Sequence, residues 1–204
     1  MAESTDDRVD ARVERTRRAL QQAALELARA GRFDDATVAD ITDAAGVNRS
    51  SYYQHYDDRD SLLADAIEAA EIEAAASAPT PTSVPAQLPP SMIAALRHFE
   101  TDADLYRRLL GERGSPIVAA RIRSRFEAQA RAGVISSGTT AFEGLPIDIV
   151  AAGIAGSCLA VIQAWLELDP RPSIETAADW VWRVLVGPGE PISAPERDGA
   201  QSSR

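Results

Sequence analysis

The sequence has no lysine and only one cysteine among its 204 residues. A single Cys cannot form an intrachain disulfide, which is typical of proteins in a reducing compartment. The first twenty residues are polar and charged, so we expect no signal peptide and a cytoplasmic location. Hydrophobic residues make up 45% and charged residues 25% of the chain, which excludes a fibrous repeat and a chain disordered throughout.

Positive charge is also scarce. All 21 basic residues are Arg, against 31 acidic residues, giving a formal net charge of -10 and a sequence pI near 4.7. This balance excludes indiscriminate binding of nucleic acid, although a local patch of Arg could still bind DNA. Residues 1–63 hold nine Arg and thirteen acidic residues, so such a patch requires Arg side chains to share one face. The basic stretch over 12–18 is either close to a DNA backbone or a solvated helix face.

Persuasive strand patterns are missing as well, and apolar residues recur at helical spacing. We therefore expect an all-α protein, with an N-terminal domain of three to four helices and a C-terminal helical bundle. Five prolines within residues 77–90 forbid a helix through that stretch. The expected boundaries are a disordered arm over 1–11, the N-terminal domain over 12–73, a Pro-rich linker or loop over 77–90, the C-terminal domain over 91–187 and a disordered tail over 188–204.

The segment TVADITDAAGVNRSSYYQHY, residues 37–56, carries the functional signal. Thr37 can cap a short helix, Gly46 breaks it, and Asn48 can cap a second short helix. This layout is typical of the helix-turn-helix, whose second helix enters the major groove of DNA. Arg49 can form a bidentate pair with guanine O6 and N7, or bind a phosphate.

Other residues around this second helix can contribute to the same interface. Two small serines let the helix sit deep in the groove, and Tyr53, His55 and Arg59 can bond phosphate oxygens. Tyr52 and Tyr56 are expected to pack in the core instead. The candidate DNA-binding residues are Thr37, Arg49, Ser50, Ser51, Tyr53, His55 and Arg59.

The longer segment TRRALQQAALELARAGRFDDATVADITDAAGVNRSSYYQHYDDRDSLL resembles the N-terminal domain of TetR-type transcriptional repressors. The resemblance covers residues 12–73 and implies a TetR-type helix-turn-helix domain there. It implies that positions 49, 50, 51 and 53 contact bases or backbone, and that positions 37, 55 and 59 hold phosphates. Arg59 departs from the usual Lys of the family. The acidic residues Asp57, Asp58 and Asp60 around it should weaken the local positive field.

The stretch over 149–166, IVAAGIAGSCLAVIQAWL, is uncharged and reaches the lower limit of a membrane span. Its near flanks are acidic and lack a basic anchor, so we favour a buried helix and expect no membrane association. TetR-like proteins dimerise through two such C-terminal helices from each subunit, forming a four-helix interface. The candidate interface residues are Val150, Gly153, Ile154, Ile162, Trp165, Val181 and Leu185.

No catalytic triad, phosphate loop, dinucleotide fingerprint or metal-ligand pattern is present in the sequence, so we expect neither an enzyme nor a bound metal or cofactor. The resemblance implies a homodimeric repressor that binds a near-palindromic operator and is released by a small apolar or amphipathic ligand. The alternative is a DNA-binding dimer without a small-molecule sensor, either constitutive or controlled by a partner. A closed apolar cavity within residues 90–168 would favour the first.

Overall fold

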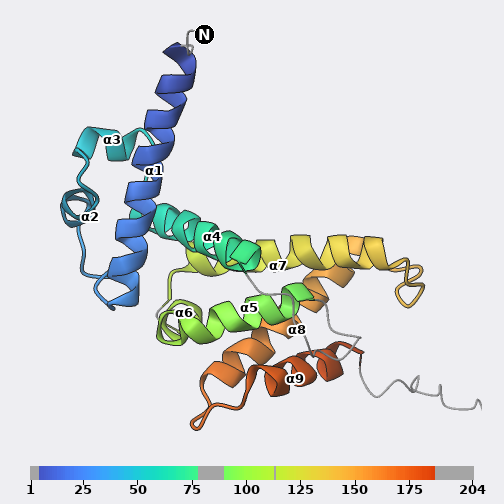
Figure 1. Ribbon diagram of the computed structural model, residues 1–204. Coiled ribbons are helices and arrows are strands. Elements are labelled where there is room, and N and C mark those ends of the chain that lie inside the picture. Colours follow the sequence, from blue (N-terminus) through green and yellow to red (C-terminus); the bar gives the residue numbers. More distant parts are fainter. Residues whose placement is uncertain (1–4, 78–89, 113, 187–204) are drawn as a thin grey trace, which may run out of the picture.

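The computed structural model describes residues 5–77, 90–112 and 114–186 (Figure 1). This part of the chain forms helices and no strand, which confirms the all-α prediction. The helices are α1 (Thr5–Arg29), α2 (Val38–Ala45), α3 (Arg49–Tyr53), α4 (Arg59–Ser77), α5 (Pro90–Thr101), α6 (Ala103–Leu110), α7 (Pro116–Ser137), α8 (Ile147–Leu166) and α9 (Ile174–Val186).

Helix α1 begins earlier than the sequence suggests. Residues 5–11, expected to belong to a disordered arm, are helical. Residues 78–89 of the expected linker, which follow α4, lie outside the described residues. The same holds for the whole of the expected tail, which follows α9.

Helices α1–α4 pack around small and branched side chains of α1. Leu20, Ala24 and Ala28, which follow one another at four-residue steps, are buried there, and Phe33 fills the space after Gly31. Gly31 ends α1 with φ of 68°, a left-handed conformation that glycine adopts without strain. The buried cluster continues without a break into α5–α9, so both halves of the chain share one core.

Two caps define the short helices α2 and α3. Thr37 and Asp40 form a reciprocal capping box at the start of α2, and Gly46 ends that helix with φ of 64°. The side chain of Asn48 accepts a hydrogen bond of 2.7 Å from the backbone N–H of Ser51 and caps α3. The predicted helix starts at Thr37 and Asn48 are therefore confirmed. Helix α3 ends at Tyr53.

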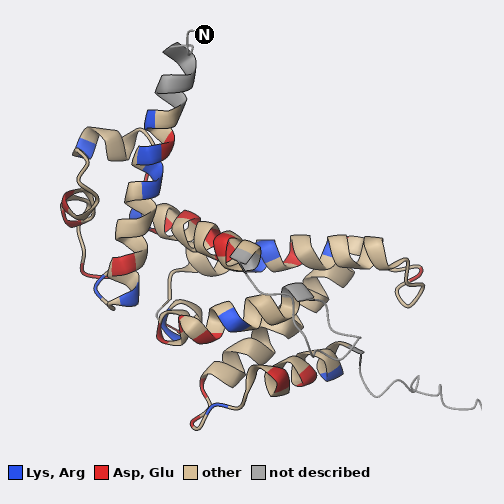
Figure 2. Cartoon of the chain, viewed as in Figure 1, with Lys and Arg blue, Asp and Glu red and all other residues tan. Residues whose placement is uncertain are grey.

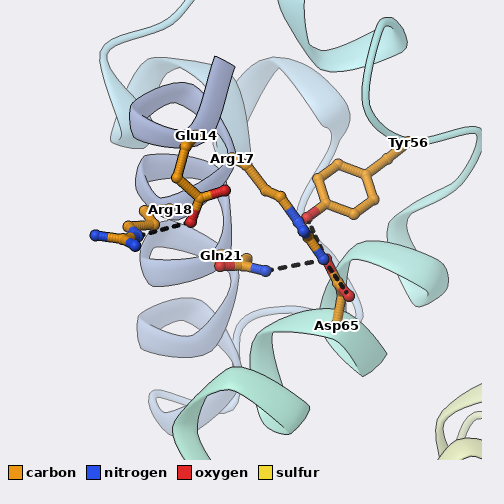
Figure 3. A network of polar contacts seen from close by, with 6 residues as sticks. All are labelled: Glu14, Arg17, Arg18, Gln21, Tyr56 and Asp65. Atoms are coloured by element: carbon orange, nitrogen blue, oxygen red, sulfur yellow. Dashed lines mark hydrogen bonds and ion pairs between the residues drawn. The ribbon is translucent and has the colours of Figure 1, made fainter. Parts of the chain in front are cut away.

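A polar network joins α1, α4 and the segment after α3 (Figure 3). The carboxylate of Asp65 accepts hydrogen bonds from Arg17 at 2.7 Å, Gln21 at 2.9 Å and the hydroxyl of Tyr56 at 2.6 Å. Burial alone would raise the pKa of Asp65, but the bonds from Tyr56, Arg17 and Gln21 prevail and hold that pKa below its usual range. The network therefore fixes the end of the α3 segment against the two longer helices.

The second half of the chain is built on the pair α7 and α8, which pack against each other, and α8 runs obliquely from the far end of α7 toward α9 (Figure 1). Ser115 caps the start of α7, and Pro116 is its first residue. The helix passes through Gly133 and ends at Gly138, whose φ is 61°. Helix α8 is apolar enough to span a membrane by length and composition, with a mean hydropathy of 1.9. It packs instead against α5, α6, α7 and α9.

Two neighbouring tyrosines allow a matched test of the core. Tyr52 is fully buried, and its hydroxyl has no hydrogen-bond partner among the described residues, whereas the hydroxyl of Tyr56 bonds Asp65. We expect Tyr56→Phe to lower the free energy of unfolding by about 1–2 kcal/mol, because a bond to a charged acceptor is lost. Tyr52→Phe should leave stability unchanged or raise it by up to about 1 kcal/mol. Urea unfolding of both variants measures this, and the reverse order would contradict the assignment.

The Asp65 network also predicts a dependence of stability on pH. Because the pKa of Asp65 is lowered by folding, its contribution is complete above its unfolded pKa of about 3.9 and is lost as the pH falls through the lower folded pKa. The difference in unfolding free energy between the wild type and Asp65→Asn should therefore be constant from pH 7 to about pH 5 and shrink in stronger acid. If the difference in unfolding free energy instead grew as the pH fell, the pKa of Asp65 would not be lowered by folding.

Candidate nucleic-acid interface

Helices α2 and α3 lie at the outer side of the N-terminal half, away from α5–α9 (Figure 1). Most of the residues predicted to bind DNA are solvent-accessible there. Thr37, Arg49, Ser50 and Tyr53 are exposed, while Ser51 and His55 are half-buried. Tyr52 and Tyr56 are buried, as the sequence analysis expects. Helix α3, which follows the turn at Gly46, therefore exposes one side to solvent and packs its other side against the core.

Arg49 and Tyr53 form a pair on the exposed side of α3. The guanidinium of Arg49 donates to the hydroxyl of Tyr53 at 3.3 Å and lies 5.7 Å from the centre of its ring. The ring of Tyr53 in turn meets the buried ring of Tyr52 edge-to-face, with 5.2 Å between centres. The position of Arg49 is thus supported by a stack that ends in the core, which reduces the freedom of a long side chain.

The serines of α3 lie around its cap. The hydroxyl of Ser50 donates to Asn48 Oδ1 at 2.7 Å, and the same oxygen accepts from the Ser51 backbone. The first turn of α3 is therefore held in helical geometry by one amide side chain. Its remaining backbone N–H groups point out of the helix N-terminus, the direction that favours an anion.

Thr37 is engaged in its own cap. Its hydroxyl donates to Asp40 at 2.6 Å and its backbone N–H donates to the same carboxylate at 2.7 Å. These bonds from Thr37 hold the pKa of Asp40 below its usual range. Any phosphate at Thr37 would meet a helix start that already carries a negative charge.

Arg59 is turned away from the exposed side of α3. Its guanidinium donates to the backbone oxygens of Phe33, Asp34 and Ala36 and lies 5.8 Å from the ring centre of Phe33. It therefore holds the loop between α1 and α2 against the start of α4. The sequence gives no direct signal for this role, because the acceptors are main-chain atoms.

The arginines of α1 divide between two roles. Arg17 and Arg29 bind the carboxylates of Asp65 and Asp102, so they belong to the packing of the protein. Arg12 and Arg15 are exposed. Figure 2 shows basic positions along the upper half of α1 and on α3, and acidic positions on α2. The positive charge near α3 is therefore confined to one end of an otherwise acidic domain.

The candidate residues of the subunit interface differ in their exposure within the protomer. Val150, Ile162, Trp165 and Val181 are at most 6% exposed and pack within the chain's own core. Gly153 is exposed, and Ile154 and Leu185 are half-buried. Because α8 is apolar on all sides, its periodicity could not distinguish the inner side from the outer one. The structure exposes the side made by Ile149, Gly153, Gly156 and Ala160.

Two cavities accompany these surfaces. An open groove of about 940 Å³ lies between α1 and α4, with Arg18, Leu25, Ile72 and Glu73 among its lining residues. A cavity of about 30 Å³ lies where α6 meets the end of α1, bordered by Gly31 and Arg108. Both lie outside the interior of the α5–α8 bundle.

Comparisons with known proteins agree with this arrangement. Residues 20–66 match the family model for bacterial regulatory proteins of the tetR family. These residues span the second half of α1, the whole of α2 and α3, and the first half of α4. No curated protein sequence is significantly similar to the chain.

Solved structures of TetR-family proteins share the fold. A TetR transcriptional regulator from Streptococcus agalactiae has a TM-score of 0.62 at 20% identity, covering 89% of this chain and 99% of that chain. FadR from Thermus thermophilus, a TetR-family repressor in complex with lauroyl-CoA, has a TM-score of 0.51 at 16% identity, covering 90% and 100%. RolR in complex with resorcinol has a TM-score of 0.51 at 22% identity, covering 86% and 88%.

The domain match and the fold lead to the same assignment. The match includes both caps, the turn at Gly46 and the exposed Arg49–Tyr53 pair. The described helices follow the fold of regulators over nearly their full length. Residues 20–66 are therefore a DNA-binding domain of the tetR family, and the described helices share the fold of TetR-family regulators.

Proposed function

We propose that the protein is a homodimeric repressor that binds a near-palindromic operator through α3 in the cytoplasm. The exposed Arg49–Tyr53 pair on the outer side of a capped helix is the observation that carries this proposal. Two recognition helices related by a twofold axis would enter successive major grooves. The net charge of -10 weakens non-specific attraction to DNA and so favours binding to the operator sequence over other DNA.

The proposed contacts differ in kind. Arg49 reads a base edge, because its fork geometry suits guanine and Tyr53 orients it. Ser50, Ser51 and Tyr53 lie close enough to the same surface to contact bases or backbone. Thr37 and His55 are assigned to phosphates. Arg59 acts from behind the surface, by holding the loop before α2.

We place the subunit interface on the exposed side of α8 together with α9. Ile149 and Val184 are 66% and 56% exposed, although both are large and apolar. A side chain added at Gly153 or Gly156 would meet nothing within 4 Å in the protomer, so these glycines leave room for close approach of a second helix. The division into a DNA-binding domain over 12–73 and a dimerisation domain over 91–187 follows from this proposal.

A small apolar or amphipathic effector is the proposed control. FadR and RolR, which share the fold, bind lauroyl-CoA and resorcinol. In this chain, Phe99 and Phe126 lie beside a buried polar pair, His98 and Tyr106, with 2.7 Å between ring nitrogen and hydroxyl. Such a mixture suits an amphipathic ligand. The alternative is a regulator without a small-molecule sensor, and the two cavities described above, which lie outside the bundle interior, are consistent with it.

The proposed contact between Arg49 and a base can be tested with an operator that the protein selects from random DNA. With an operator obtained by selection from random duplexes, Arg49→Ala should weaken binding by about 1–3 kcal/mol and relax the preference at one base pair. Arg123→Ala, a change at an exposed position of α7, serves as the control and should leave binding unchanged. Fluorescence anisotropy at two salt concentrations measures both. An equal loss on random duplex would show that Arg49 binds a phosphate.

The interface has an equally direct test. Gly156→Glu should convert the dimer to a monomer, because it buries a charge without a partner, while the protomer has space for the side chain. Gly133→Glu makes the same change on α7, where the added group also meets nothing, and should remain dimeric. Sedimentation velocity distinguishes the two. A dimeric Gly156→Glu variant would place the interface elsewhere.

One experiment distinguishes a regulator controlled by a small-molecule effector from a regulator without such a sensor. Lauroyl-CoA and resorcinol serve as probes, together with any compound released when the purified protein is denatured. An effector should raise the melting temperature and weaken operator binding by about 5–150-fold, the usual range of allosteric coupling. If none of these compounds changes operator affinity and nothing is released, a regulator without a small-molecule sensor is favoured.

A further inference from the structure

The groove between α1 and α4 is the larger of the two cavities described above, with a volume of about 940 Å³. One wall is a stripe of α1 from Glu14 to Arg29, and the other is a stripe of α4 from Asp65 to Ala76. None of the candidate DNA-binding residues lines it, and Figure 1 shows α2 and α3 on one side of α1 while α4 extends from the other. The groove is therefore a second surface of the N-terminal half.

The middle of the groove is apolar and lined by short side chains. Ala66, Ala69 and Ala70 of α4 project little from their helix, so another helix can approach them closely. On the same wall Ile72 is 56% exposed, and on the opposite wall Leu25 is half-buried. A concave surface of small residues with two large apolar side chains suits the apolar face of a third helix.

The charge that lines the groove is negative in sum. Each of its three arginines is already paired with a carboxylate, at 2.7–2.8 Å, in the pairs Arg17–Asp65, Arg18–Glu14 and Arg29–Asp102. Three further lining residues, Glu26, Glu68 and Glu73, form no ion pair with the described arginines. Glu26 accepts a hydrogen bond from the neutral amide of Gln22, which leaves its charge uncompensated. This surface repels a polyanion such as DNA and attracts a cationic partner.

The size of the groove agrees with the same kind of partner. A helix about 10–12 Å across that rises about 5.4 Å per turn occupies about 400–600 Å³ per turn. The groove, at about 940 Å³, therefore has room for about two turns. A contact of this size is typical of a transient interface and not of an obligate one.

We propose that the groove between α1 and α4 is a docking surface for a basic amphipathic helix of a partner protein. Apolar residues of that helix, one turn apart, pack against Ile72 and Leu25 over the alanine floor. Lys or Arg residues at its edges face Glu26 on one wall and Glu73 on the other. This surface adds to the proposed function and does not depend on it.

The experiment uses the full chain in the absence of DNA. Peptides about 18 residues long, enough for about five helical turns, are randomised over helix-forming residues, displayed on phage and selected against the wild type. The selected peptides are then synthesised, and their dissociation constants are measured by fluorescence anisotropy at about 0.1 M and about 1 M salt.

Two groove variants separate the apolar contact from the charge. Ile72→Gln removes the exposed apolar side chain, and Glu26→Lys together with Glu73→Lys reverses the charge of both walls. Matched controls make the same changes at exposed positions outside the groove: Ile117→Gln alone, and Glu100→Lys together with Glu143→Lys. Circular dichroism checks that all variants remain folded. If Ile72→Gln is unfolded, Ala69→Gln, which fills the floor with a longer side chain, takes its place.

The selected peptides should carry apolar residues at helical spacing and a net positive charge. Ile72→Gln should weaken their binding by about tenfold or more at both salt concentrations, because a central apolar anchor is lost. The reversed glutamates should weaken binding by about tenfold at low salt and much less at high salt, since the screening length falls from about 10 Å to about 3 Å. Both controls should bind within about twofold of the wild type.

Three outcomes would overturn the proposal. The first is that no peptide is enriched over selection against an unrelated protein. The second is that the enriched peptides are neutral or acidic, which would contradict the charge of the surface. The third is that they bind both groove variants as tightly as the wild type, which would place their site elsewhere. None of these results involves operator DNA, so they are independent of the proposed function.

Discussion

The carboxylate of Asp65 is the contact on which the geometry of the DNA-binding domain depends. Helix α3 has five residues and is too short to be stable by itself. Its orientation follows from the buried ring of Tyr52 on one side and the bond from Tyr56 to Asp65 on the other. Because Arg17 and Gln21 of α1 share the same carboxylate, α1, α4 and the α3 segment are located by one group.

Charged side chains also fix the position of the DNA-binding domain where it meets the rest of the chain. The far end of α1 is bound by Asp102 and Arg108, while α4 contributes Glu71, whose carboxylate lies 2.5 Å from Arg125 of α7. Charged pairs in which the carboxylate is buried fix direction as well as distance, since they lose much of their energy if their geometry relaxes. The two halves are thus joined by directional contacts set within a continuous apolar core.

Local signals predicted the helix-turn-helix well. The Thr37 cap, the break at Gly46 and the Asn48 cap each depend on residues within four positions, so the sequence contains the whole interaction. Features that depend on distant atoms could not be predicted. The carbonyls that engage Arg59 come from a loop more than twenty residues away.

Helix α8 and its neighbour α7 show two other limits. The inner side of α8 is set by neighbouring helices and not by its own pattern, because apolar residues surround it. Gly133 can continue α7 because a glycine in a helix costs only about 1 kcal/mol, which tertiary packing offsets.

The stack of Tyr52, Tyr53 and Arg49 has a consequence for how related sequences can diverge. A substitution at position 53 would re-aim an unchanged Arg49, so related proteins could present a different surface at α3 while keeping the same arginine.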